Sequence, residues 1–421
     1  MRNPPGAKMQ IRVRFVICLA VLMFPLGGAG QELPEHFLPV RPIGMGGAFT
    51  AIANDQNSIW TNPAGIGRIR KHRSRKHLHL LSVPNLVGGV NDQAQSFYGS
   101  FKTAGAENSG ADAAANVKTA IENTATIDKP IWARAAINPV AFVEITRGTP
   151  GVFSLFSNTR LKIQVDKDDT SSAQVESVSD TGAVLGIGLT NNTNRHNLGL
   201  QVRPIFRFAY DERVDLETLT NTSEMQKRIL TEGNTVSAVA LDLGWMWTFA
   251  DYWFPSVGVS VLNVPTGCRQ NFLNPFTELR ETICGTTFKG SINNEESLFL
   301  VDPTDIRVGV SLTPRIFHKV ALRFAVDVHH LYLSSGDTYY GLPGAEPIKT
   351  VHGGIELFIG NPLLLHPFSA RLGVSQGFVT TGVTLRVGPV FLEFASYGQD
   401  ISAETTSKED RRTLFALSLE L

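Results

Sequence analysis

The sequence is poor in charged residues and lacks long hydrophobic runs. Asp, Glu, Lys and Arg make up 18% of its 421 residues, against roughly 25% in an average soluble protein. Beyond residue 30, no stretch approaches the run of about 20 apolar residues that a membrane-spanning helix needs. The apolar residues are spread evenly and the mean hydropathy is zero, which excludes a helical membrane protein, a disordered chain and a coiled coil. The composition leaves a large all-β protein, either soluble or a membrane barrel.

The first thirty residues have the pattern of a secretory signal peptide. Four basic residues (Arg2, Lys8, Arg12 and Arg14) precede an apolar run over 15–26, and small residues follow at 27–30. Such a segment is cleaved during export, and its twelve apolar residues are too few for a permanent span. We therefore expect residues 1–30 to be a signal peptide of a protein exported to the outer membrane of a Gram-negative-type bacterium. Without them, 38 − 4 = 34 basic residues face 38 acidic residues, a balance that offers no surface for nucleic acid.

Cysteine is nearly absent. Beyond the expected signal peptide only Cys268 and Cys284 remain, in a polar segment. In an oxidising compartment such a pair is expected to form a disulfide that closes one loop. Neither cysteine has a second Cys or His at ligand spacing, so we expect no metal site and no cofactor.

The chain from about residue 77 onward alternates between apolar and polar residues. Leu198, Leu200 and Val202 share one face of such a segment, whereas Gln201 and Arg203 share the other. Period-two alternation predicts β-strands with one apolar and one polar face. A soluble sandwich buries the apolar face, and an outer-membrane barrel turns it toward lipid.

Three features favour the barrel. The alternating runs are about nine to fifteen residues long, beyond the five or six typical of sandwich strands. Aromatic residues gather where a run ends, as in Trp245, Trp247 and Phe249, which is typical of a membrane-interface girdle. The last run, from Phe415 to Leu421, is a strand of the kind by which the barrel-assembly machinery recognises its substrates. We predict about 14 antiparallel strands over residues 77–421, with long loops outside the cell.

A glycine-rich segment precedes the first predicted strand. It runs from Arg41 through Gly44-Met45-Gly46-Gly47 and Phe49 to Asn54-Asp55, and ends in Asn62-Pro63-Ala64-Gly65. This pattern resembles the FadL-like outer-membrane family, which includes the toluene porins. The resemblance covers about 25 residues and implies that residues 31–76 form a hatch inside a fourteen-stranded barrel. The family has a pair of acidic residues where this chain has Asn54 and Asp55, which puts ion-linked gating in doubt.

The residue types of this segment suit a plug. Glycines allow close approach of backbones, and Pro63 restricts Asn62 to an extended conformation. Without the resemblance, a surface turn followed by a small helix would explain the same residues. The hatch residues that we single out are Gly44, Met45, Gly46, Gly47, Phe49, Asp55, Asn62, Pro63 and Ala64.

Charged residues recur on the polar faces of the predicted strands. Each would cost a few kcal/mol facing lipid at the midplane, so we expect them to line the lumen. Their simplest role is an ion-pair network that stiffens the barrel and seats the plug; the alternative is an arginine-lined site for a substrate carboxylate. They are Arg203, Arg207, Asp242, Arg307, Arg323, Asp327, Glu356, Arg371, Arg386 and Glu393.

No catalytic motif is evident, so we expect no enzyme. The basic run over 68–76 fits a solvated edge better than a lipid-binding patch. The favoured function is passive uptake of small hydrophobic molecules, either long-chain fatty acids or aromatic hydrocarbons, as the family resemblance implies. Asn138-Pro139 is the candidate strand kink for a lateral exit, because Pro removes a ladder hydrogen bond. The alternative is a barrel that anchors secreted proteins through its loops.

Overall fold

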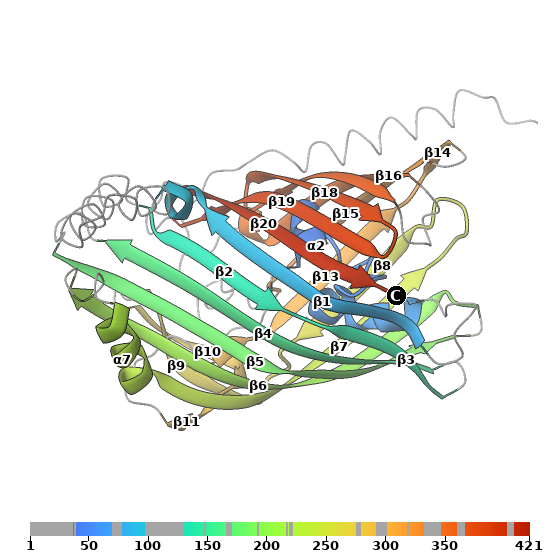
Figure 1. Ribbon diagram of the computed structural model, residues 1–421. Helices are drawn as coiled ribbons and strands as arrows, with labels where there is room; N and C mark the ends of the chain where they lie inside the picture. The colour runs from blue at the N-terminus through green and yellow to red at the C-terminus, as the bar shows by residue number, and fades with distance from the viewer. Residues whose placement is uncertain are drawn as a thin grey trace, which may run out of the picture.

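The structure is a closed antiparallel β-barrel (Figure 1). This computed structural model describes residues 37, 39–69, 78–96, 129–146, 149–165, 171–191, 193–215, 218, 222–274, 279–291, 301–317, 320–331, 347–359, 367–401 and 408–421. The predicted signal peptide and most of the basic run lie outside these residues. Among the described residues, no helix is long and apolar enough to cross a membrane.

The strands occupy most of the described chain. They are β1 (Leu78–Asn91), β2 (Ile131–Ile137), β3 (Val140–Thr146), β4 (Thr149–Val165), β5 (Ser172–Thr190), β6 (His196–Asp215), β7 (Asn234–Thr248), β8 (Ser256–Leu262), β9 (Gly267–Asn274), β10 (Leu279–Thr287), β11 (Lys289–Ser291), β12 (Val301–Pro303), β13 (Asp305–Leu312), β14 (Arg315–Phe317), β15 (Val320–Val328), β16 (Val351–Ile359), β17 (Phe368–Ser375), β18 (Phe378–Val387), β19 (Val390–Asp400) and β20 (Glu409–Glu420). The helices are α2 (Val40–Gly44), α3 (Ser58–Thr61), η1 (Pro63–Arg68), α7 (Thr222–Glu232) and α8 (Pro347–Thr350).

Neighbouring strands pair antiparallel around the ring, and β20 pairs with β1 to close it. β2 and β3 are two halves of one interrupted wall strand, since both pair with β1 and with β4. The short β11 and β14 extend the ladder beside β7 and β15, whereas β9, β10 and β12 form a separate sheet. The ring therefore has 14 strands, which confirms the predicted barrel and its strand number.

The two faces of the wall have opposite character. Outward side chains are apolar and remain exposed, as with Leu185 on β5, Leu243 on β7 and Leu372 on β17. Inward side chains are buried and largely polar, among them Arg203 and Asp242. This apolar-out, polar-in alternation is that of a barrel with lipid around it. The fold is thus that of an outer-membrane barrel.

The wall is much higher on one side than on the other. β4, β5 and β6 have 17, 19 and 20 residues, whereas β13, β16 and β17 have 8, 9 and 8. The helix α7 lies at the far end of the tall strands (Figure 1), where Met225 and Ile229 pack against Tyr210 and Val214. We call this end, which also carries the β9–β10 hairpin, the loop end. The opposite end, with short connections such as the one between β18 and β19, is the turn end.

Candidate functional site

The N-terminal segment (residues 39–69) lies inside the barrel. Figure 1 shows α2 behind β19 and β20, within the ring of strands. The short helices α2, α3 and η1 are joined by tight turns, and Gly46 and Gly47 have φ of 68° and 87°, a region that glycine adopts without penalty. At Asn62 the chain is extended, with φ −153° and ψ 108°. The Asn62 side chain accepts a hydrogen bond from the Ala64 N–H and donates one to the Thr50 carbonyl.

A belt of inward-facing glycines receives the segment. Gly188, Gly199 and Gly244 are direct cross-strand neighbours on β5, β6 and β7. A Cβ on these three residues would overlap the backbone at Gly67, the Pro63 carbonyl and the Asn62 side chain, respectively. The segment therefore rests on bare backbone along this wall. We call the following set the glycine belt: Gly188, Gly199, Gly244, Gly258, Gly309, Gly354, Gly373 and Gly382.

The belt continues around the ring. Gly258 on β8 faces the Thr50 carbonyl, and Gly354 on β16 faces the Met45 carbonyl. Gly373 lies beside Gly46, and Gly382 on β18 lies beside Gly44. The N-terminal segment thus contacts bare glycine backbone on many strands. The whole segment, rather than one end, is therefore seated against the wall.

Arg41 joins the segment to the wall through charge. Its guanidinium donates to both carboxylate oxygens of Glu356 at 3.0 and 2.8 Å and to Asp55 at 2.6 Å. Glu356 also accepts hydrogen bonds from Arg323 at 2.9 Å and Arg371 at 3.0 Å. Burial alone lowers the pKa of Arg41, but the nearby carboxylates raise it above its ordinary value. Three arginines therefore share one fully buried carboxylate.

Two further wall residues hold the turns of the segment. Asp327 accepts hydrogen bonds from the Phe49 and Thr50 N–H groups, each at 2.7 Å. His352 Nδ1 lies 2.7 Å from the Gly46 carbonyl oxygen.

At the other end of the segment, burial and the charge of Arg323 lower the pKa of Arg68 to about 10, so Arg68 remains a cation at neutral pH.

Arg203 and Arg207, four positions apart on the inner face of β6, hold the two ends of the connection between β8 and β13. Arg203 pairs with Asp242 and donates to Asn263 at 2.7 Å. Arg207 pairs with Asp180 and with Asp302. This connection is thereby attached at both ends to the tall wall.

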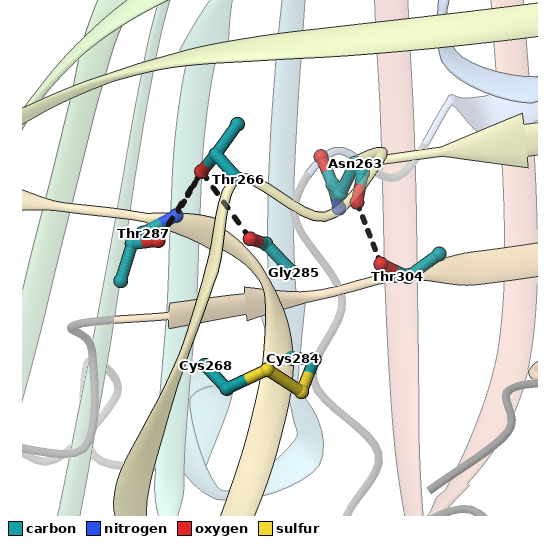
Figure 2. Close-up of a disulfide and its surroundings, with 7 residues drawn as sticks. All are labelled: Asn263, Thr266, Cys268, Cys284, Gly285, Thr287 and Thr304. Carbon is teal, nitrogen blue, oxygen red and sulfur yellow. Dashed lines mark hydrogen bonds between the residues drawn. A yellow bond between two sulfur atoms is a disulfide. The ribbon is translucent and has the colours of Figure 1, made fainter.

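The connection also contains the two cysteines. Cys268 and Cys284 face each other on β9 and β10 and are joined by a disulfide (Figure 2). Figure 2 shows Thr266 bonded to Gly285 and to Thr287, next to the disulfide. The disulfide and these bonds fix the base of the hairpin.

The remaining predicted lumen charges make local contacts. Arg307 pairs with Asp305, two residues away. Arg386 donates to the Gly388 carbonyl near the turn end. Glu393 lies 3.8 Å from Arg371. The ten predicted charges thus divide into those around Glu356, those around Arg203 and Arg207, Asp327 at the Phe49–Thr50 turn, and these three peripheral ones.

The wall is interrupted where Asn138 and Pro139 separate β2 from β3. The facing strand β1 shifts register at the same level, between Val83 and Leu86. Asn85 and Asn138 exchange hydrogen bonds there, through the Asn138 N–H at 3.0 Å and the Asn85 side chain at 3.1 Å. Paired asparagines replace the regular ladder at this level, which we call the wall break (residues 84–85 and 138–139).

Trp60 of the N-terminal segment contacts the wall break directly. Its indole N–H donates to Asn138 Oδ1 at 3.1 Å. The ring stacks on Phe37 with centroids 4.3 Å apart and meets Phe156 edge-on. The guanidinium of Arg203 lies 5.6 Å from the ring centroid. Trp60 is therefore a link between the seated segment and the interruption in the wall.

A cavity of about 90 Å³ adjoins Trp60 on the side of the loop end. Its apolar lining comes mainly from the segment and from β8, and its polar lining from β6, from the residue after β8 and from the loop-end termini of β13, β15, β16 and β17. The apolar part includes Phe37, Ile43, Ile59, Trp60 and Leu262; the polar part includes Arg203, Asn263, Asp305, Arg307, His329, His330, His352 and Gln376. Within the described part of the chain, no group of three or more His, Cys, Asp or Glu residues is arranged to hold a metal ion.

Sequence reasoning missed the glycine belt, Trp60 and His352. The belt did have a signal, because its glycines occupy the same alternate positions as the lumen charges: Gly199 with Gln201 and Arg203, Gly244 with Asp242, Gly354 with Glu356. Trp60 lies between the two parts of the N-terminal motif, Gly44 to Asp55 and Asn62 to Gly65, and no residue pattern marks it as a contact. The contact of Pro84-Asn85 with Asn138-Pro139 depends on strand register, which the sequence does not reveal.

Solved structures similar to this chain include channels with low sequence identity. A TodX monoaromatic hydrocarbon channel mutant is 8% identical with a TM-score of 0.48, over 94% of this chain and 100% of that chain. The CymD monoaromatic hydrocarbon channel is 10% identical with a TM-score of 0.46, over 93% and 97%. The Pseudomonas putida toluene transporter TodX is 9% identical with a TM-score of 0.46, over 94% and 99%. No protein-family model and no curated protein matches the chain.

Proposed function

We propose that the protein is an outer-membrane channel for passive uptake of small hydrophobic molecules, with the N-terminal segment as its hatch. The single observation that carries this proposal is the position of Trp60, which lines the cavity and also donates a hydrogen bond to Asn138 in the wall break. A molecule in the cavity is thereby in contact with the residue that holds the segment to the interrupted wall.

The wall break provides a lateral exit at lower cost than a path along the barrel axis. An axial path requires the segment to leave the glycine belt, with the loss of contacts on many strands. At the wall break, one backbone bond and one side-chain bond between Asn85 and Asn138 already stand in place of the regular ladder. Opening it exposes few additional backbone groups to hydrocarbon, where each unsatisfied group costs several kcal/mol. A hydrophobic molecule leaving there enters the bilayer.

Replacing Pro139 with valine tests this exit. Valine restores a backbone N–H and lets β2 run into β3. One added hydrogen bond stabilises the closed wall by about 1 kcal/mol, so we expect uptake into proteoliposomes to fall roughly fivefold. The measurement is the rate at which a radiolabelled hydrophobic compound enters the vesicles.

Pro150→Val is the matched control. Pro150 lies on β4 opposite Glu144, away from the wall break, and we expect its replacement to leave the rate unchanged. Equal uptake by the Pro139 variant and the wild type would exclude the lateral exit. An anchor for secreted proteins would show a different pattern, in which exchange of the connection between β8 and β13 abolishes function and Pro139→Val has no effect.

A further inference from the structure

One buried aromatic side chain of the connection between β8 and β13 reaches into the barrel. Phe288 lies between β10 and β11, and the next residue, Lys289, pairs with Ser237 near the loop-end start of β7. The side chain of Phe288 is fully buried. It belongs to an apolar cluster whose other described members come from the N-terminal segment and from the wall strands. The connection thus places a ring at the loop end of this cluster.

The cluster extends from Phe288 to the wall break. It includes Ile59 and Trp60 of the N-terminal segment, which also line the cavity. It also includes Val140 and Phe142 on β3, directly beyond the wall break. An apolar molecule would therefore meet apolar side chains from the loop end to the proposed lateral exit. The ring of Phe288 occupies the loop-end limit of that route.

Arg207 holds this ring against the tall wall. Its guanidinium carbon lies 4.2 Å from the centroid of the Phe288 ring, within the range of a cation–π contact. The same guanidinium donates to both carboxylate oxygens of Asp302, on β12 of the same connection, at 2.7 and 3.1 Å. A ring and a carboxylate of one connection are therefore attached to a single side chain of β6.

A second carboxylate makes this attachment reversible. Asp180 on β5 also accepts two hydrogen bonds from Arg207, at 2.6 and 2.9 Å. A buried charge that loses its only partner is expensive, but Arg207 would keep Asp180 if Phe288 and Asp302 moved away. Release of the connection therefore leaves the buried guanidinium paired with the wall.

We propose that Phe288 is the entrance gate of the apolar interior, held closed by Arg207 and Asp302, and that a hydrophobic molecule enters from the loop end when the ring leaves its place. The inference rests on the proposed uptake function and adds an entry step to the lateral exit. If Phe288 only filled space, its loss would weaken the barrel without opening it.

Thiol labelling in the detergent-folded protein tests the gate. Ile205 is 3% exposed in the cluster, on the inner face of β6 between Arg207 and Arg203. The two described cysteines are joined in a disulfide, and the unsubstituted protein gives the background rate. Ile205→Cys should react slowly with N-ethylmaleimide while the gate is closed. Adding Phe288→Ala should raise the rate about tenfold, which corresponds to a shift of about 1.4 kcal/mol in the open population.

Phe358→Ala is the matched control for the loss of a ring. Phe358 is also fully buried next to an arginine, with the Arg323 guanidinium 5.1 Å from its centroid, but it lies on the wall strand β16. Its replacement should leave the labelling rate of Ile205→Cys unchanged. Phe288→Leu, with a smaller increase in rate, takes the place of Phe288→Ala if the alanine variant does not fold.

Asp302→Asn and Asp180→Asn form a second matched pair. Both carboxylates bind the guanidinium of Arg207, and neither substitution leaves a cavity. Asp302→Asn loosens the connection, so we expect labelling about threefold faster through a larger open population. Asp180→Asn leaves the bonds between Arg207 and the connection intact, and the labelling rate should not rise.

The outcomes separate the gate from the function on which it rests. The gate is wrong if Phe288→Ala and Asp302→Asn both leave the labelling rate unchanged. It is also wrong if Phe358→Ala raises the rate as much as Phe288→Ala, because general loosening of the barrel then exposes the thiol. Entry of radiolabelled toluene into proteoliposomes, compared with protein-free vesicles, tests the uptake function. If labelling responds as expected but the wild type admits no toluene above that background, the gate stands and the uptake function is wrong.

Discussion

Replacing Gly199 and Gly244 together with valine should unseat the N-terminal segment and open the barrel to ions and sugars. A Cβ at either position overlaps Pro63 or Asn62, and the obstacle at Gly199 is backbone, which cannot rotate away. Overpacking typically costs about 1–3 kcal/mol per site. The combined cost of the two substitutions therefore exceeds the roughly 1.4 kcal/mol that corresponds to a tenfold change in an equilibrium. We expect at least a tenfold higher conductance in planar bilayers.

The control for this experiment faces the lipid on the same two strands. Leu200 and Leu243 are exposed on the outside of β6 and β7, and valine at both positions should leave the conductance and the folding yield unchanged. Gly199→Ala alone is a milder variant in case the double valine does not fold. A folded variant whose conductance equals that of the wild type would show that the glycine belt does not hold the segment.

Replacing Glu356 with glutamine should strongly destabilise the barrel. Glu356 is fully buried between Arg41, Arg323 and Arg371, with oxygen–nitrogen distances of 2.8 to 3.0 Å. Glutamine keeps the shape but leaves these guanidinium groups without their common anion. Removing one partner of a buried ion pair costs about 3–5 kcal/mol, and we expect a loss of that size in urea unfolding of the refolded protein.

An exposed ion pair provides the comparison. Arg195 and Asp251 pair at 3.2 Å with side chains 45% and 81% exposed, and such pairs contribute about 0–1 kcal/mol. Asp251→Asn should therefore have little effect. A loss below about 1 kcal/mol for Glu356→Gln would mean that water replaces the carboxylate and that this part of the lumen is not dry.

The barrel was predictable because its physical cause is local. Alternation such as Leu198, Leu200 and Val202 against Gln201 and Arg203 sets which face meets lipid, and it persists through every long strand. The strand number followed from the same pattern. The unequal heights of the walls were not predictable from that pattern. β5 and β6 continue beyond their apolar stretches through hydroxyl and charged residues, which are also typical of loops.

The contacts of the N-terminal segment were harder to predict from the sequence. The motif from Gly44 to Asp55 and the pair Asn62-Pro63 marked the segment, and the alternation of charges marked the lumen. Which charge meets which depends on strand register and on the path of a segment with little regular structure. The sharing of Glu356 by three arginines joins residues up to 315 positions apart, and no local pattern contains that information.

The unequal walls give the protein a direction in the plane of the membrane. A transmembrane strand needs about 9–11 residues, so roughly half of the 19- and 20-residue strands β5 and β6 project past the bilayer as a one-sided screen. On the opposite side, β16 and β17 end near the membrane surface, and their loop-end residues His352 and Gln376 border the cavity. The cavity thus lies closer to the rim of the barrel on the side of β16 and β17 than on the side of the tall strands.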